Sequence, residues 1–202
     1  MKIYFDGTSW TWGAELDNPQ EERFSKLICD KLGAEECNFS KRGGSNDRIV
    51  RNILVENDIK EYDLAIIEMT FPARTEYYNG ETWMKVNPGR TYQESLHTIK
   101  DYDYKNLDQK RSSLPNNFWK EYYKVVGNEL FFDTKEEIHF KTIRNHFKLN
   151  GVPLIFCTTN HWTKLKFDCL LSTKDIPRAP KKHPNKEGHR QIADKIIGML
   201  TS

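Results

Sequence analysis

Short apolar runs alternate along this chain with longer segments in which apolar residues recur at helical spacing. Runs of apolar, β-branched and aromatic residues predict buried strands at residues 2–5, 35–39, 63–69 and 152–157. Apolar faces of helical period predict helices at residues 20–32, 47–57, 119–132 and 186–200. One more helix is expected to begin at a cap formed by Asp133, with Glu136 completing a capping box, and to end near Leu149.

Strands that alternate with helices predict a parallel sheet covered by helices on both faces. We therefore expect a three-layer α/β/α sandwich with at least four parallel strands, formed by a single domain over residues 1–202. Residues 71–132 differ from the rest because they are rich in aromatic residues and weakly periodic. We interpret them as an insertion, which should lie over the carboxyl ends of the strands, where such sheets bind ligands.

Composition excludes several classes of function. The net charge of +2 is too small to favour nucleic acid or an anionic membrane as a partner. No apolar run approaches the roughly 18 residues of a membrane span, and the N-terminus lacks a signal-peptide pattern. The four cysteines form no CxxC pair, so neither a metal site nor a cofactor is expected. Reduced thiols and a cytoplasmic location follow as expectations, for a cellular, viral or phage product alike.

Two segments at opposite ends of the chain carry the candidate chemistry. Ser9 lies in the polar turn after the first predicted strand, between Gly7 and Gly13. His183 precedes Pro184 and the last predicted helix, which places it at the rim of the sheet. His189 lies inside that helix, and we expect it to be packed and structural. A plain β–α turn at Ser9 and a helix-flanking role for His183 are the alternatives without chemistry.

Together these segments resemble the SGNH hydrolase family, the GDSL-like lipases and esterases. The first block of that family, GDSxTxG, matches residues 7–13, with threonine at position 8 in place of aspartate. Its last block matches His183-Pro184-Asn185, Gly188-His189 and Ile192-Ala193, and its glycine block is similar to residues 42–49. The resemblance covers most of the chain outside residues 71–132 and implies a flavodoxin-like sheet.

The resemblance implies Ser9 as nucleophile, His183 as its base, and the backbone N–H groups of Ser9 and Gly43 as oxyanion donors. The family's GxND block is absent after the third strand, so Asn46 or Thr70 is considered for the third donor. The family aspartate three residues before the histidine is also absent, since Pro180 stands there. The partner of His183 is left open between Asp175, another carboxylate such as Asp168, and a backbone carbonyl or water.

The implied function is a serine esterase acting on a small-molecule or carbohydrate ester, for instance as a carbohydrate O-acetylesterase. Trp10 and Arg74 are candidate substrate-binding residues, with further aromatic faces at Trp12, Tyr77, Tyr78 and Trp83. Core packing is the alternative for the aromatic residues, and a salt bridge with Glu76 for Arg74. A non-catalytic binding protein on the same scaffold is the competing function, and an acyltransferase is a weaker third. The oligomeric state is not indicated.

Overall fold

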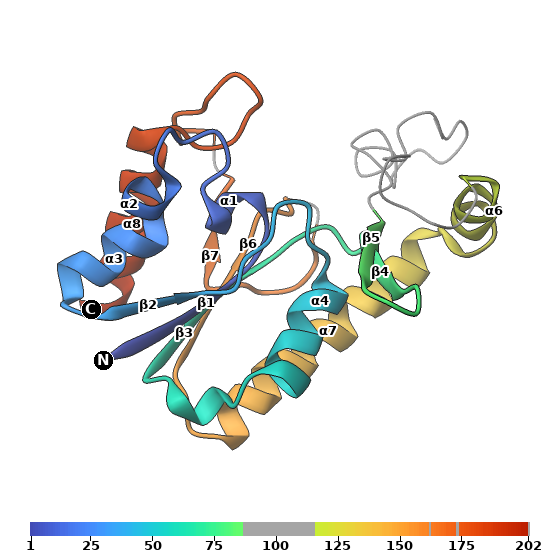
Figure 1. Cartoon of the computed structure of the whole chain (residues 1–202), viewed down its shortest axis with the longest axis horizontal. Helices are drawn as coiled ribbons and strands as arrows, with labels where there is room; N and C mark the ends of the chain where they lie inside the picture. Colours follow the sequence, from blue (N-terminus) through green and yellow to red (C-terminus); the bar gives the residue numbers. More distant parts are fainter. Residues whose placement is uncertain (87–115, 162, 173, 202) are drawn as a thin grey trace.

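The computed structural model describes residues 1–86, 116–161, 163–172 and 174–201. Its centre is a five-stranded sheet in the order β2-β1-β3-β6-β7, with every neighbouring pair parallel (Figure 1). This confirms the predicted parallel sheet and its flavodoxin-like order. The strands are β1 (Lys2–Asp6), β2 (Glu35–Asn38), β3 (Leu64–Met69), β6 (Leu154–Thr158) and β7 (Cys169–Leu170).

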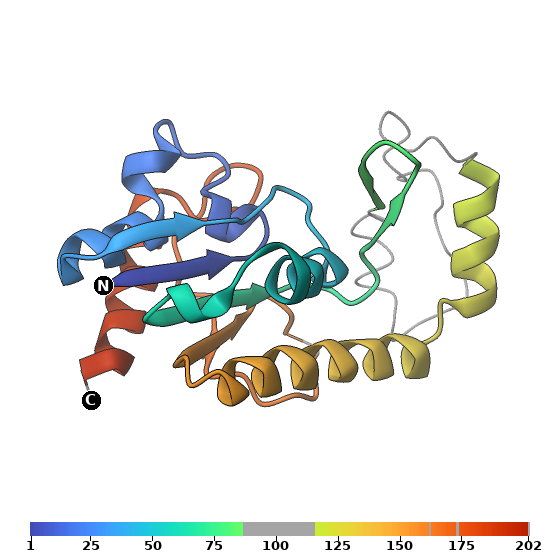
Figure 2. The same ribbon diagram turned by 60° about the horizontal axis from the view of Figure 1, so that its bottom comes forward.

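Helices cover both faces of the sheet and complete the three layers (Figures 1 and 2). The first face carries α1 (Ser9–Trp12), α2 (Pro19–Glu22), α3 (Phe24–Leu32) and α8 (Lys186–Thr201). The second face carries α4 (Asn46–Arg51), continued by a π-helical turn over Asn52–Glu56, and α7 (Glu129–Leu149). A 3-10 turn at Ile59–Glu61 leads into β3. In the described part of the chain, no helix is long and apolar enough to cross a membrane.

Alternating side chains along the central strands build the two halves of the core. In β1, Ile3 and Phe5 pack with α3 and α8, whereas Tyr4 packs with α4 and α7. In β6, Ile155 packs on the side of α3 and α8, and Phe156 packs on the side of α4 and α7. Because the central strands are apolar on both faces, the sheet is buried on both sides, as parallel sheets require.

Helix boundaries between residues 116 and 149 differ from the sequence prediction. The predicted helix at 119–132 is α6 (Asn116–Val126), and α7 begins at Glu129 instead of after Asp133. Asn128 caps α7 by accepting a 2.9 Å hydrogen bond from the N–H of Phe131. Glu136 forms no capping box, because it lies inside the helix and accepts hydrogen bonds from Asn160 and Thr163.

Three smaller differences have local causes. The predicted helix at 20–32 is divided in two, because Arg23 adopts an extended conformation with ψ of 148°. The predicted helix at 47–57 becomes a π-helical turn after Arg51, and Leu54 in that turn is 44% exposed, since the turn changes the angular spacing of side chains. The short strand β7 was not predicted, because two residues give no periodic signal.

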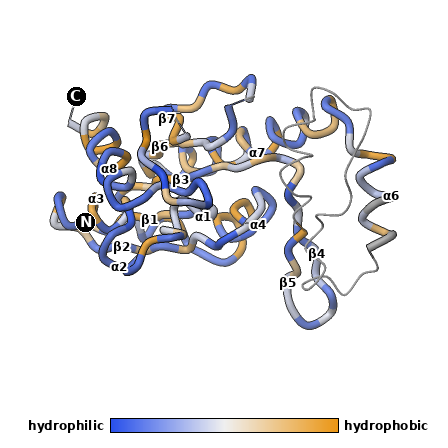
Figure 3. Tube along the Cα trace, turned by 90° about the horizontal axis from the view of Figure 1, so that it is seen from above, coloured by the Kyte–Doolittle hydropathy of each residue, from blue (hydrophilic) through white to orange (hydrophobic). Residues whose placement is uncertain are grey.

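The described part of residues 71–132 forms a hairpin and a helix beside the main sheet. Strands β4 (Thr75–Tyr78) and β5 (Trp83–Val86) pair antiparallel, and together with α6 they lie at the end of the molecule away from both termini (Figure 3). A small separate cluster packs here, comprising Ala73, Val86, Trp119, Tyr123 and Phe132. The hairpin reaches the loop after β2, where Lys85 Nζ donates to the carbonyl of Arg42 at 2.7 Å. Residues 87–115 of the predicted insertion lie outside the described part.

Candidate active site

Ser9 begins α1 directly after the carboxyl end of β1, and its side chain is partly buried. The turn that presents it requires a glycine at position 7. A Cβ there would lie 2.4 Å from Oγ1 of Thr11 and 2.7 Å from the carboxyl group of Glu68. The close approach of these three residues therefore explains why the first block begins with glycine.

The side chain of Glu68 holds the turn around Ser9 from beneath. Glu68 is 1% exposed at the end of β3, and its carboxyl group accepts four hydrogen bonds. The donors are the backbone N–H and the hydroxyl of both Thr8 and Thr11, at 2.5 to 3.0 Å. Sequence reasoning missed Glu68, although a charged residue inside an otherwise apolar strand is a signal that could have identified it.

The structure brings Ser9 and His183 together across 174 sequence positions. Nε2 of His183 lies 3.0 Å from Oγ of Ser9, within hydrogen-bond distance. On the other side of the ring, Nδ1 lies 2.7 Å from Oε2 of Glu15. The three side chains thus form a continuous serine–histidine–carboxylate chain, the arrangement of a hydrolytic triad.

Glu15, another carboxylate than Asp175, is the partner of His183 that the sequence left open. Its carboxylate accepts the 2.7 Å contact from the ring and also the backbone N–H groups of Lys181, at 2.8 Å, and His183, at 3.1 Å. Burial alone would raise the pKa of Glu15, but these hydrogen bonds outweigh it and hold the pKa below its usual value. The other aspartate considered, Asp168, instead accepts the N–H of Phe156 at 2.7 Å.

Backbone strain marks both sides of the contact between Glu15 and His183. Among the described residues, Glu15 and Lys182 are the only non-glycine residues with positive φ, each at 72°. Left-handed backbone in such residues is uncommon and concentrates at functional sites. No sequence signal separated Glu15 from its neighbour Asp17, because the conformation that directs Glu15 to the ring depends on the folded loop.

The segment carrying His183 is fixed at both ends. Before the ring, the N–H of Ala179 donates to the carbonyl of His183 at 2.8 Å, closing a tight loop. After it, the side chain of Asn185 accepts the N–H of Gly188 at 2.9 Å and caps α8. His189, one turn further on, is fully buried and accepts the N–H of Phe24 at 3.1 Å, which gives it the structural position expected. Burial lowers its pKa to about 4.

Of the residues considered for an oxyanion hole, Gly43 lies in an exposed loop beside the nucleophile turn, whereas Asn46 and Thr70 pair with each other. Gly43 has φ of 67°, which explains the glycine at this position, and it follows the loop segment whose Lys41 N–H donates to the carbonyl of Gly7 at 3.1 Å. Asn46, by contrast, is fully buried and pairs with the backbone of Thr70 through both ends of its amide, at 2.9 Å each. This pairing orients the Asn46 amide toward the segment after β3, which is a structural role.

The two candidate substrate-binding residues, Trp10 and Arg74, also differ in burial. Trp10 is 9% exposed and belongs to the core cluster on the first face, which favours the packing interpretation over a stacking face. Arg74 is half-buried, with its guanidinium 5.7 Å from the ring centre of Phe71. The salt bridge suggested between Arg74 and Glu76 is replaced by one between Glu76 and Arg51, at 2.7 Å.

A second serine–histidine contact, between Ser172 and His161, has a different character. Ser172 Oγ lies 2.8 Å from Nε2 of His161 and donates its only hydrogen to the carbonyl of Thr159, also at 2.8 Å. His161 must therefore donate to the hydroxyl and cannot act as a base toward it. Ser9 is thus the serine whose contact with histidine has the geometry for activation.

The order of the sheet and the position of this site at its carboxyl edge define a flavodoxin-like α/β fold with a candidate active site at the place where such folds bind ligands. No protein-family model matches the chain, and no curated protein matches it in sequence. Among solved structures, it is similar to the lipase Lip_vut3 from a goat rumen metagenome, with a TM-score of 0.52 and 11% identity over 98% of this chain and 96% of that one. This likeness shows a shared fold at a large distance in sequence.

Two further structures align over nearly all of this chain. One is a family two carbohydrate esterase from Clostridium thermocellum in complex with cellohexaose, with a TM-score of 0.49 and 12% identity over 98% of this chain and 63% of that one. The other is the psychrotrophic esterase EstA from a Pseudoalteromonas species, with a TM-score of 0.47 and 12% identity over 99% and 96%.

Proposed function

We propose that this protein is a divergent SGNH-type serine ester hydrolase whose triad is Ser9, His183 and Glu15. The observation that carries the proposal is the unbroken chain of contacts from Ser9 Oγ through the imidazole to Glu15, at 3.0 and 2.7 Å. A buried structural histidine would not need a partly exposed serine on one nitrogen and a carboxylate on the other. Carbohydrate acyl esters are the proposed substrate class, supported by the exposed aromatic faces of Tyr78 and Trp83.

In the proposed reaction, Nε2 of His183 removes the hydroxyl proton of Ser9 as Oγ attacks the ester carbonyl carbon. Glu15 accepts the hydrogen on Nδ1, which fixes the tautomer and stabilises the imidazolium that forms. The imidazolium then returns the proton to the departing alkoxide, leaving an acyl group on Ser9. Water, deprotonated by the same imidazole, hydrolyses that acyl group and regenerates the serine.

Charge develops on the carbonyl oxygen during the attack, and it requires preorganised donors. The proposed donors are the backbone N–H groups of Ser9 and Gly43. Lys85 supports the second of these, because its ammonium binds the carbonyl of Arg42, which belongs to the same peptide group as the Gly43 N–H. A cation on the carbonyl oxygen polarises that peptide and strengthens its N–H as a donor.

Labelling with a fluorophosphonate tests the proposal without knowledge of the substrate. The reagent phosphonylates a serine only when a base activates it, so we expect one adduct per chain, located on Ser9 by peptide mass spectrometry. The variant Ser172→Ala should be labelled like the unmodified protein, because His161 cannot activate Ser172. Absence of an adduct in folded protein would favour the competing function, a binding protein on a hydrolase scaffold.

Glu68 should affect turnover by holding the nucleophile turn. Replacing it with alanine removes the acceptor for four donors, leaving the buried N–H groups of Thr8 and Thr11 unpaired. We expect a loss of about 2–4 kcal/mol in the free energy of unfolding and a decrease in kcat of about 10- to 100-fold from displacement of Ser9. Denaturant unfolding and p-nitrophenyl acetate hydrolysis measure the two effects.

Glu136 provides the matched control for this variant. It is another buried acidic residue, 2% exposed, and its partners Asn160 and Thr163 lie on the loop after β6. Glu136→Ala should lower stability by a similar amount while kcat, measured well below the unfolding temperature, stays within about twofold. Equal loss of kcat in both variants would show that Glu68 acts only through global stability.

A further inference from the structure

The peptide group between Gly7 and Thr8 is held at both ends by charged side chains. Its carbonyl oxygen accepts a hydrogen bond from Nη2 of Arg48 at 2.7 Å, and its N–H donates to the carboxyl group of Glu68 at 3.0 Å. Both charged side chains are buried. A cation on the carbonyl polarises the peptide and strengthens the hydrogen bond from its N–H. The plane of this peptide is therefore fixed, and Ser9 is the next residue.

The guanidinium of Arg48 also binds the loop after β2, which carries Gly43. Nη1 donates to the carbonyl of Phe39 at 2.9 Å. From the same loop, the N–H of Lys41 donates at 3.1 Å to the carbonyl that Nη2 binds. The carbonyl of Lys41 in turn accepts the N–H of Gly44 at 2.9 Å and closes the turn that contains Gly43. One side chain thus joins the nucleophile turn to the loop of the second proposed oxyanion donor.

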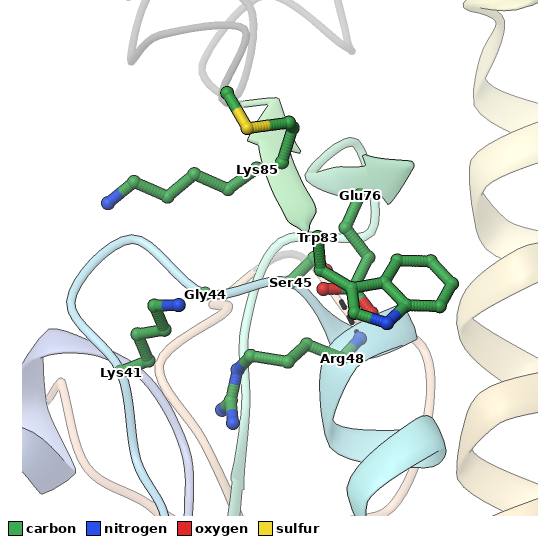
Figure 4. A pocket seen from close by; sticks show the side chains of 8 residues that line it. Lys41, Gly44, Ser45, Arg48, Glu76, Trp83 and Lys85 are labelled. Carbon is green, nitrogen blue, oxygen red and sulfur yellow. Dashed lines mark hydrogen bonds between the residues drawn. The ribbon is translucent and has the colours of Figure 1, made fainter. Parts of the chain in front are cut away.

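Asp6 and Gly44 restrict the position of this guanidinium. Asp6 is fully buried at the end of β1 and accepts hydrogen bonds from Nη2 of Arg48 at 2.5 Å and from the amide of Asn52 at 2.9 Å. Gly44 lets the loop lie against the guanidinium, because a Cβ there would be 2.8 Å from Nε of Arg48. Figure 4 shows the Arg48 side chain extending from α4 past Gly44, at one side of a pocket of about 330 Å³.

We propose that Arg48 is a positioning residue, which sets the distance between the two proposed oxyanion donors, the backbone N–H groups of Ser9 and Gly43. This proposal rests on the hydrolase function above and adds a residue to its machinery. A planar guanidinium with several donors can bind both segments at fixed angles. Oxyanion donors stabilise the transition state only when they are preorganised around the position that the charged oxygen takes. Arg48 acts through the backbone and does not touch the substrate.

Replacing Arg48 with lysine tests this role, because lysine keeps the charge but lacks the planar fork that binds several acceptors at once. We expect kcat for p-nitrophenyl acetate to fall about 10- to 100-fold while KM stays within about twofold, since the donors act on the transition state. The rate of fluorophosphonate labelling at Ser9 should fall by a similar factor, because the phosphonyl oxygen uses the same donors.

Arg51→Lys is the matched control, since it makes the same change in the same helix. The guanidinium of Arg51 binds Glu76 on the hairpin through hydrogen bonds of 2.7 and 3.2 Å. The kcat and the labelling rate of this control should stay within about twofold of the original values. An equal loss in Arg51→Lys, or an unchanged kcat in Arg48→Lys, would overturn the proposal.

A double variant separates positioning from stability. Arg48→Met leaves the buried carboxylate of Asp6 without its cation, which should destabilise the protein. Adding Asp6→Asn removes that charge, so the denaturant midpoint should move back toward the original value. The kcat of the double variant should stay at least about tenfold low, because methionine cannot bind the carbonyls of Gly7 and Phe39. If kcat recovered together with the midpoint, Arg48 would act only by neutralising Asp6, and the proposal would be wrong.

The labelling experiment also distinguishes failure of this proposal from failure of the hydrolase function. If Ser9 of the original protein forms no adduct, the hydrolase function fails and the positioning role fails with it. If Ser9 is labelled, and Arg48→Lys is labelled at the same rate, only the positioning role fails.

Discussion

Replacing Ser9 with alanine should lower kcat about 10⁶-fold, because the variant has no nucleophile at the position that His183 would activate. Stability should change by no more than about 0.5 kcal/mol, since the hydroxyl is partly exposed and contacts only His183 among the hydrogen bonds described for it. Hydrolysis of p-nitrophenyl acetate and denaturant unfolding measure these two quantities. The same loss is expected for His183→Ala.

Ser172→Ala is the control for Ser9, because it removes the other serine that contacts a histidine. Its kcat should stay within about twofold of the original, as expected for a serine outside the reacting site. If Ser9→Ala retained a tenth of the activity, or if Ser172→Ala lost as much, the assignment of the nucleophile would be wrong.

Replacing Glu15 with glutamine should lower kcat about 10³- to 10⁴-fold, the effect of losing the orienting acid in a serine triad. Glutamine can present an amide hydrogen to Nδ1 of His183, which would favour the tautomer that cannot accept the proton of Ser9. The pH profile of kcat/KM checks the role further. Because hydrogen bonds hold the pKa of Glu15 below its usual value, its carboxylate should stay charged at pH values where an ordinary glutamate begins to be protonated, so Glu15 itself should not cause a loss of activity in that range.

Asp175→Asn tests the nearest aspartate before His183 in the sequence, and the kcat of this variant should remain unchanged within about twofold. A rate for Glu15→Gln above about a tenth of the original would show that the backbone around Lys181 orients His183 without help from the carboxylate. The kcat of Glu15→Asp should lie between that of Glu15→Gln and that of the original protein, because the shorter side chain keeps the charge but lengthens the contact with His183.

The fold was predictable because its signals are periodic and repeated. Apolar runs at β1, β3 and β6, separated by amphipathic helices, allow few arrangements other than a parallel sheet with two covered faces. The boundaries that differed, at Asn128 and at Arg23, depend on single capping or extended residues. Such features contribute little to a pattern and are fixed by packing.

The site was only partly predictable, and the reason differs from residue to residue. Ser9 and His183 could be selected because each lies in a segment where several neighbouring residues match a block of the family that the sequence resembles. Glu15 could not, because its role arises from a contact that only the folded chain makes, across 168 sequence positions. Glu68 stands out as a charge in an apolar strand, but its partner Thr8, 60 positions away, is known only from the fold. Asn46 was considered as a third oxyanion donor, and its pairing with the backbone of Thr70, 24 residues away, gives no signal in the sequence.

Two members of the proposed triad, Ser9 and Glu15, come from one short segment after β1, whereas His183 comes from the loop before α8. Hydrolysis therefore requires the C-terminal segment that carries His183 to be packed against the segment that carries Ser9 and Glu15. A chain ending before His183 would lack the base, and would also lose the backbone N–H groups that hold Glu15. If residues 177–202 were supplied as a separate peptide, the concentration needed to recover hydrolysis would measure the affinity of α8 for α3 and the sheet. Activity would then report whether the two fragments have assembled.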